Sequence, residues 1–350
     1  MSRFVRIPQT QCKKKPRWSV IAGLKEQRDP GSQRFPDDEL PPGANRTNVE
    51  LEFTKLSGAG NDFIAINNMD GKIPEEGRRE LFSSWCRRGL SVGADGVLLV
   101  EPPTAPASGA HFRMRYYNAD GGEVETCGNG SRCIARFACE IGIAPSKMRF
   151  ETLAGPYAAI VLQNGDVCLE MSDAADFQPD LENIDLTEAE NKSAFAPAPI
   201  DFINTGVPHA VMILQQLTPP GSPAAPAASQ GSVALENYPV IAAGRLLRHH
   251  PAFAPAGTNA NFVEIVSGSR HELRVRTYER GVEDETLACG TGCIASAIVA
   301  SRRGLVEPPV KVQTRGGEQL IVNFIPTSAG ATGVTLQGSA RIVFRGVMSL

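Results

Sequence analysis

A cysteine-glycine motif occurs twice in this 350-residue chain, each time at the start of a run of small and apolar residues. The first copy is Cys-Gly-Asn-Gly at 127–130, and the second is Cys-Gly-Thr-Gly at 289–292. Gly142 and Gly304 stand at the same distance beyond the two cysteines, where each is expected to end a helix. The repetition predicts two similar halves, each with a buried helix that begins at a thiol.

The motif places a thiol beside the free backbone N–H groups of a helix start. These groups have no partner within the helix, and the helix dipole gives them partial positive charge. Glycine lets a carboxylate approach them closely, and the same field favours a thiolate. Two such thiols, one on each side of a carbon, could remove a proton from one face and supply one to the other. One copy alone would be read as a buried cysteine, but the matched pair favours a cofactor-independent racemase or epimerase.

Composition indicates a globular protein rather than a disordered one. Apolar residues make up 42% of the chain and charged residues 21%, as in folded proteins, and the length is sufficient for two domains. The net charge of −3 gives no electrostatic basis for binding nucleic acid or an anionic membrane. No apolar run reaches the length of a membrane span. We therefore expect neither a nucleic-acid nor a membrane partner.

The eight cysteines suggest free thiols rather than disulfides or metal ligands. Their spacing fits no disulfide framework in a chain of this size, and the glycines and absent histidines around the two motifs argue against zinc. Neither a metal nor another cofactor is expected. Free thiols require a reducing compartment, so we expect a cytoplasmic protein. Four further cysteines are expected to be packing residues, namely Cys133, Cys139, Cys168 and Cys293.

Residues 1–50 differ in composition from the rest. Basic residues precede the first acidic one, Glu26, and the segment from Pro30 to Asn48 is rich in Pro, Gly, Asp and Asn. A disordered extension is the preferred interpretation. A transit peptide to an organelle and a misassigned start codon are the alternatives.

Short strand patterns fill most of the remaining sequence. Asn164-Gly165 indicates a hairpin, and the Pro- and Ala-rich stretch 218–232 an exposed loop insertion. The helix expected at 293–300 is apolar nearly all round and must be surrounded. Each half is therefore expected to be a curved sheet around one helix. Strands are expected at 50–56, 63–66, 97–100, 111–117, 263–266, 272–278, 310–314, 319–324 and 340–344.

Five ordered motifs make the chain resemble the diaminopimelate epimerases over roughly residues 51–350. Besides the two cysteine motifs they are Ser-Gly-Ala-Gly-Asn-Asp-Phe at 57–63, Tyr-Asn-Ala-Asp-Gly-Gly-Glu at 117–123 and Tyr-Glu-Arg-Gly at 278–281. The resemblance implies an isomerase of lysine and peptidoglycan-precursor biosynthesis. It would convert LL-2,6-diaminopimelate to the meso form without pyridoxal phosphate or metal.

The resemblance also implies a fold of the α/β (α+β) class with two domains related by a pseudo-two-fold axis. Each would be a β-barrel-like mixed sheet wrapped around a central helix, with the site in the cleft between them. The first domain would span 51–172 and be joined by the C-terminal strand 338–350. The second would span 173–337.

A role carries over to each matching residue. Cys127 and Cys289 correspond to the acid and the base, which exchange roles with the direction of reaction. Backbone donors to the carboxylate at the reacting carbon correspond to Gly128, Asn129, Gly290 and Thr291. Groups that hold the rest of the substrate correspond to Asn61, Asn118, Asn259, Arg280 and, as an acceptor for an ammonium group, Glu279. An arginine suits a distal carboxylate, because it can donate two parallel hydrogen bonds. Outside this context each asparagine would be a turn or cap residue, and the Glu–Arg pair an exposed ion pair.

Two positions depart from the family pattern. Gly96 stands where many members carry glutamine, and Val207 where many carry asparagine, which leaves substrate affinity less constrained than the chemistry. His209 lies in the motif Thr-Gly-Val-Pro-His at 205–209. It either helps to poise a thiol or is a hydrogen-bonded structural histidine.

Two alternatives stay open. A proline or hydroxyproline racemase would share the paired cysteines, but Glu279, Arg280 and Asn118 suit a substrate with a second charged end. A catalytically silent amino-acid-binding protein of the same fold would not need both thiols. The sequence also leaves open whether the protein is a homodimer, how far the domains close, and which thiol is the base for which stereoisomer.

Overall fold

The computed structural model describes residues 50–105, 109–125, 127–181, 184, 199–214 and 234–350. All of them belong to one compact unit that spans residues 48–350. The expected N-terminal extension, apart from Glu50, and the expected loop insertion at 218–232 lie outside these residues. Within the described part of the chain, no helix is both long and apolar enough to cross a membrane.

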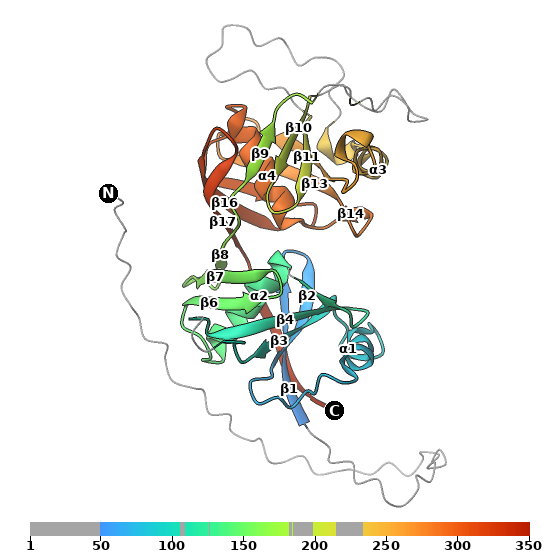
Figure 1. The fold of residues 1–350 in the computed structure, drawn as a ribbon, viewed down its shortest axis with the longest axis vertical. Helices are drawn as coiled ribbons and strands as arrows, with labels where there is room; N and C mark the ends of the chain where they lie inside the picture. Colours follow the sequence, from blue (N-terminus) through green and yellow to red (C-terminus); the bar gives the residue numbers. More distant parts are fainter. Residues whose placement is uncertain (1–49, 106–108, 126, 182–183, 185–198, 215–233) are drawn as a thin grey trace, which may run out of the picture. The chain divides into compact units, whose positions relative to one another are not determined.

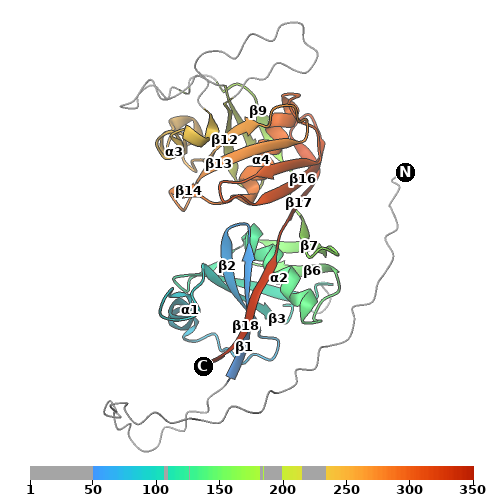
Figure 2. The same ribbon diagram turned by 180° about the vertical axis from the view of Figure 1, so that it is seen from behind.

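The first half of the fold is a mixed sheet around α2 (Gly128–Glu140), as Figures 1 and 2 show. Strands β2 and β3 pair in parallel, as do β4 and β6, and the other neighbours are antiparallel. The helix contacts β1, β2, β3, β4, β7 and β8, which surround it. The strands are β1 (Glu50–Gly58), β2 (Asn61–Asn67), β3 (Gly96–Glu101), β4 (Phe112–Asn118), β5 (Glu123–Val124), β6 (Lys147–Thr152), β7 (Gly155–Val161) and β8 (Val167–Glu170).

The second half repeats this arrangement around α4 (Gly290–Arg302). Strands β11 and β12 pair in parallel, as do β13 and β15, with antiparallel neighbours elsewhere. Its strands are β10 (Ile200–Asn204), β11 (Pro208–Ile213), β12 (Asn259–Ile265), β13 (Glu272–Glu279), β14 (Asp284–Thr286), β15 (Val310–Gln313), β16 (Gln319–Pro326) and β17 (Ala331–Gly338).

The two halves therefore match element for element. A hairpin of one long and one short strand precedes each central helix, β4–β5 before α2 and β13–β14 before α4. A second helix follows the second strand of each half, α1 (Arg78–Cys86) and α3 (Val240–Arg248). The duplication inferred from the cysteine motifs thus extends to the whole topology.

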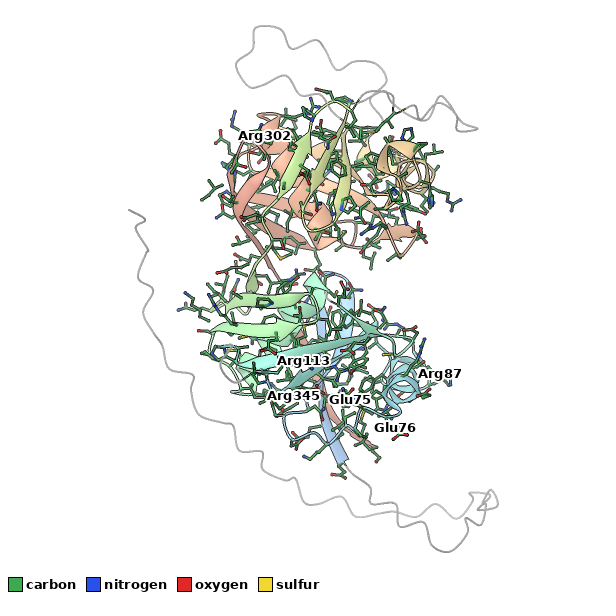
Figure 3. The ribbon with its side chains drawn as sticks, in the orientation of Figure 1. Glu75, Glu76, Arg87, Arg113, Arg302 and Arg345 are labelled. Atoms are coloured by element: carbon green, nitrogen blue, oxygen red, sulfur yellow. The ribbon has the colours of Figure 1, made fainter. Side chains whose placement is uncertain are left out.

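The halves also exchange their last strands. β9 (Ala175–Gln178) follows the first half in sequence but pairs with β10, while β18 (Arg341–Ser349) follows the second half but pairs with β1. Both views show β18 beside β1 (Figures 1 and 2). Arg345 of β18, labelled in Figure 3, also donates to Glu140 at the end of α2 over 3.0 Å. Strands β8 and β17 pair as well, so one continuous sheet runs through both halves.

The central helices begin and end as the sequence predicts. Cys127 and Cys289 are the N-caps, and Gly142 and Gly304 follow the C-terminal ends with φ values of 76° and 71°. Left-handed backbone of this kind favours glycine and lets the chain leave the helix sharply. The buried faces of α2 and α4 each lie within an apolar core.

All the expected strands are present, with bounds that differ by up to five residues. The hairpin expected at Asn164-Gly165 connects β7 and β8. Short outer helices such as α1 were not predicted, because charged residues interrupt the apolar pattern of 78–86.

Candidate functional site

The two thiols stand at equivalent points of the duplicated fold. Each caps its helix from an extended backbone, with φ and ψ of −148° and 118° at Cys127 and −114° and 110° at Cys289. The Sγ of Cys127 accepts the N–H of Gly130 at 3.5 Å. The Sγ of Cys289 lies 3.5 Å from the hydroxyl of Thr291. Both sulfur atoms therefore face the free end of a helix, as the motif predicts.

Burial nevertheless raises the pKa of both thiols. For Cys127 it outweighs the hydrogen bonds from the backbone of Gly130 and Asn129, which lower that pKa. For Cys289 burial is reinforced by the nearby charge of Glu279 and only partly offset by Thr291. The sequence predicts that the helix field favours the thiolate, and in the free protein burial outweighs that field at both cysteines. Desolvation favours the neutral thiol over the thiolate.

Glu279 lies at the end of β13, where its charge acts on both thiols. It raises the pKa of Cys127 and of Cys289, which places this carboxylate near each of them. Burial in turn raises the pKa of Glu279, offset in part by the hydroxyl of Thr286. A carboxylate in such surroundings gains from a cationic neighbour, which agrees with its expected role toward an ammonium group.

Arg280 follows Glu279 but does not pair with it. Its guanidinium donates to the carbonyl of Ala256 at 3.3 Å, and no carboxylate of the described residues lies within ion-pair distance of it. Its backbone N–H donates to the Oδ1 of Asn259 at 2.8 Å. The Nδ2 of Asn259 donates in turn to the carbonyl of Pro208 at 2.9 Å. Asn259 thus fixes the backbone at Arg280 and leaves the guanidinium available to an anion.

Asn61 and Asn129 form one hydrogen-bonded group beside Cys127. The Nδ2 of Asn129 donates to the Oδ1 of Asn61 at 2.8 Å, and the Nδ2 of Asn61 donates to Asp95 at 3.1 Å. Arg132, a residue that was not predicted, donates to the Oδ1 of Asn129 at 2.6 Å. A charged residue within the apolar run of α2 was the signal for it.

Asn118 ends β4, opposite Gly96 of β3. Its Oδ1 accepts the hydroxyl of Tyr116 at 2.8 Å, which leaves its amide N–H groups to donate. Tyr116, whose role was also not predicted, lies within electrostatic reach of Cys127 and Glu279. A Cβ at Gly96 would lie 2.4 Å from the carbonyl oxygen of Tyr117, so no larger residue fits there without a shift.

His209 is fully buried in β11 and contacts the side chain of Asn261. Its Nδ1 lies 3.0 Å from the Nδ2 of Asn261, whose oxygen accepts the hydroxyl of Thr277. Nδ1 is therefore the acceptor, and the ring proton sits on Nε2, which has no partner among the described residues. Burial lowers the pKa of His209 to about 3, despite the bond to Asn261. The ring is neutral and cannot stabilise a thiolate as a cation.

The loop before His209 is tied to the second cysteine motif. The hydroxyl of Thr205 donates to the carbonyl of Thr291 at 3.3 Å, and the N–H of Thr205 donates to the carbonyl of Val207. Val207 is partly exposed beside this connection and contributes an apolar side chain. Gly290, like Gly128 in the first motif, is the first helical residue, so its N–H is free of intrahelical bonds.

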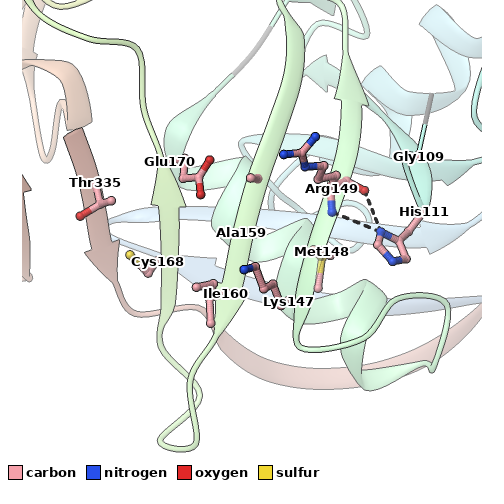
Figure 4. Close-up of a pocket in the computed structure, with 11 residues that line it drawn as sticks. Gly109, His111, Lys147, Met148, Arg149, Ala159, Ile160, Cys168, Glu170 and Thr335 are labelled. Atoms are coloured by element: carbon pink, nitrogen blue, oxygen red, sulfur yellow. Dashed lines mark hydrogen bonds between the residues drawn. The ribbon is translucent and has the colours of Figure 1, made fainter. Parts of the chain in front are cut away.

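A surface cavity elsewhere in the first half does not involve these residues. It is lined by side chains of β6, β7 and β8, including Lys147, Arg149 and Glu170, together with Thr335 of β17 (Figure 4). Figure 4 also shows the ring of His111 bonded to the backbone of Arg149. Among the described residues, no cluster of three or more His, Cys, Asp or Glu side chains could hold a metal ion.

Comparison with known proteins identifies one family that the sequence matches over most of its length. The sequence model of the diaminopimelate epimerase family matches residues 53–177 and 202–343. A diaminopimelate epimerase of Aquifex aeolicus is 40% identical over 307 residues, which cover 85% of this chain and 98% of that protein. One from Cupriavidus taiwanensis is 36% identical over 321 residues, covering 86% and 98%.

Solved structures share the fold at low sequence identity. A phenazine biosynthesis protein of the PhzF family from Bacillus anthracis is 13% identical with a TM-score of 0.57, covering 86% of this chain and 99% of that one. A hydroxyproline epimerase from Agrobacterium vitis, solved with trans-4-hydroxy-L-proline, is 18% identical with a TM-score of 0.55, covering 87% and 94%. These likenesses concern the fold alone. By the match of the family model and the identity to its members, the chain belongs to the diaminopimelate epimerase family.

Proposed function

We propose that this protein epimerises LL-2,6-diaminopimelate to the meso form by a two-thiol mechanism without a cofactor. The observation that carries the proposal is the pair of thiols at equivalent helix starts, both within reach of Glu279. Family membership narrows the substrate, and the chemistry of the two helix starts supports the reaction type. Because the reaction needs free thiols, the proposal includes a reducing compartment, the cytoplasm.

In one turnover one sulfur atom takes up a proton and the other gives one up. The thiolate of one cysteine takes the proton from the α-carbon and becomes a thiol. The electron pair left on carbon is delocalised into the α-carboxylate. The other thiol then gives its proton to the opposite face and becomes a thiolate. The two cysteines have exchanged protonation states, so the reverse reaction starts from the product enzyme.

The helix starts stabilise the charge that develops during this step. The free N–H groups at the start of α2 and α4 belong to the residues that follow each cysteine. A carboxylate held there gains hydrogen bonds that strengthen as negative charge moves onto its oxygens. The same donors stabilise a thiolate, and the α-ammonium group of the substrate adds a positive charge to the site. We therefore expect substrate binding to lower the pKa values of both thiols, against the effect of burial.

Arg280 and Asn118 favour a substrate with a second charged end, as in a diamino dicarboxylic acid. Arg280 offers a guanidinium without a carboxylate partner among the described residues, and Asn118 offers amide N–H groups. A second carboxylate fits the guanidinium through two parallel hydrogen bonds. A proline-like ring has no second charged end to satisfy it, which disfavours the racemase alternative.

Proton NMR of the reduced protein in D₂O tests the proposal. We expect the α-proton signal of LL-diaminopimelate to disappear as the meso isomer forms, and proline to stay unchanged. Exchange with proline alone would assign the protein to the racemase alternative, and exchange with neither substrate would contradict the proposal. Cys127→Ala and Cys289→Ala should each lower the rate by at least about 10³-fold. Cys168→Ala, which removes a thiol of β8 far from both motifs in sequence, should leave it unchanged.

A further inference from the structure

Arg132 is a fully buried arginine of α2 whose charge is not neutralised by an ion pair among the described residues. Its Nη2 donates to Asn129, but Nε and Nη1 have no hydrogen-bond partner within the described part of the chain. Arginine stays protonated in proteins, so the interior here carries an uncompensated positive charge. Burying a charge without a partner disfavours folding, and packing alone does not account for it.

The duplicated fold supplies an internal comparison. Arg132 and Ile294 hold the same position, two residues after the second glycine of their motifs, and both are fully buried. Helix α4 therefore packs well with an apolar side chain at this position. The fold therefore does not require a guanidinium at this position. Of the two equivalent positions, only the one in the half that contains Cys127 carries an arginine.

The charged groups that act on Cys127 differ from those that act on Cys289. Arg132 favours the anionic form of Cys127, while Glu279 on β13 disfavours it. The largest charged influence on Cys289 is Glu279, which disfavours its thiolate. The field of Arg132 also reaches three other groups, namely Cys133 on α2, Cys293 on α4 and Glu318 beside β16.

We propose that Arg132 is a positioning residue that makes Cys127 ionise before Cys289, so that Cys127 is the base that begins turnover in the free enzyme. This inference rests on the two-thiol function proposed above. Arg132 acts through its neighbours: its charge stabilises the Cys127 thiolate, and its bond to Asn129 turns that amide toward Asn61. The N–H of Asn129 at the helix start is thereby held in place for the carboxylate.

The wild-type enzyme provides the first test, with iodoacetamide as the probe and no substrate present. Alkylation of Cys127 and Cys289 is followed separately by peptide mass spectrometry over a range of pH. The pH midpoint of each rate reports ionisation, whereas accessibility changes only the plateau. We expect the midpoint of Cys127 to lie at least about one pH unit below that of Cys289. Equal midpoints, or a lower midpoint for Cys289, would overturn the inference.

Variants of α2 separate charge from shape. Arg132→Met should raise the Cys127 midpoint by about one pH unit, whereas Arg132→Lys, which keeps the charge, should leave it close to wild type. Arg136→Met is the matched control, because Arg136 lies one turn further along α2 and pairs with Glu140 at 3.4 Å. Equal shifts in both Arg132 variants, or none in either, would contradict the role of the charge.

The two proposals fail separately. If Arg132→Met does not fold, the wild-type midpoints and Arg132→Lys still decide the inference. Alkylation needs no diaminopimelate, so its outcome does not depend on the substrate. Loss of the α-proton signal in D₂O by wild-type enzyme, together with equal midpoints, would leave the epimerase function standing and remove the asymmetry.

Discussion

Glu279 and Arg280 are adjacent in sequence, but their side chains have different surroundings. The charge of Glu279 acts on both thiols and burial raises the pKa of its carboxyl group, while Arg280 keeps a guanidinium without a carboxylate partner among the described residues. An exposed ion pair between them, the simplest alternative, is not present in the structure. A substrate with ammonium and carboxylate groups at both ends can satisfy the two residues at once.

Replacing Arg280 tests the recognition of the distal carboxylate. Arg280→Lys keeps the charge but loses the two parallel donors, so we expect KM for LL-diaminopimelate to rise about 10- to 100-fold. The turnover number should fall much less, because the thiols and helix starts are untouched. Steady-state kinetics measure both constants. Arg302→Lys is the control, since that guanidinium lies over the ring of Phe177; an unchanged KM in Arg280→Lys would contradict the assignment.

His209 gives the fold a predictable sensitivity to acid. Its folded pKa of about 3 lies below the ordinary value of 6.5, so between these values the unfolded chain binds a proton that the folded protein does not. The stability contribution of His209 is therefore complete above pH 6.5 and is lost as the pH falls toward 3. Each pH unit in this window costs about 1.4 kcal/mol.

Chemical denaturation measures this effect. Between about pH 7 and 5 the wild-type free energy of unfolding should fall by about 2 kcal/mol more than that of His209→Gln. His249→Gln replaces an exposed histidine and should keep the wild-type slope. Identical slopes for wild type and His209→Gln would show that the buried ring is not responsible.

The hairpin before each central helix contains an equivalent Arg–Glu ion pair between its two strands, which we call the brace. In β4–β5, Arg115 donates to both carboxylate oxygens of Glu123 at 2.6 and 2.7 Å. In β13–β14, Arg276 donates to both oxygens of Glu285 at 2.6 and 2.7 Å. Each hairpin runs directly into a cysteine motif, so the brace fixes the chain just before the thiol. Duplication has preserved this support although most other side chains differ.

Breaking one brace should destabilise the fold more than breaking a surface pair. Glu285→Gln leaves the largely buried guanidinium of Arg276 without its counter-charge, so we expect the free energy of unfolding to fall by about 3 kcal/mol. Glu307→Gln breaks the exposed pair with Arg270 and should cost less than about 1 kcal/mol. Denaturant titration of both variants measures the difference, and equal losses would refute the role of the brace.

At the scale of the whole molecule, the features that can be predicted from the sequence are those that depend on neighbouring residues in the chain. The ends of α2 and α4 follow from cysteine and glycine caps, and the strand patterns follow from alternation. The exchange of β9 was not predictable in this way, because it depends on pairing between segments that nothing local specifies. The thiol pKa values and the burial of Arg132 were missed for the same reason: both depend on what packs around a residue, not on its neighbours in sequence.

The placement of one proposed catalytic thiol in each half predicts a redox control of the whole molecule. If the two thiols flank a single carbon, as proposed, we expect them to come close enough to form a disulfide when no substrate lies between them; both are free in this structure. An added oxidant such as diamide would take up the two electrons and two protons that are released, and neither a base nor an acid would remain. Such a bond would also tie one half of the fold to the other.

We therefore expect activity to be lost on oxidation and restored by a reductant, with substrate slowing the loss. Peptide mass spectrometry identifies the Cys127–Cys289 bond, and activity is measured on the same samples. In Cys168→Ala the loss should be the same as in wild type, because that thiol takes no part. Full activity in protein shown to carry the Cys127–Cys289 disulfide would be incompatible with a mechanism in which both sulfur atoms exchange protons with the substrate.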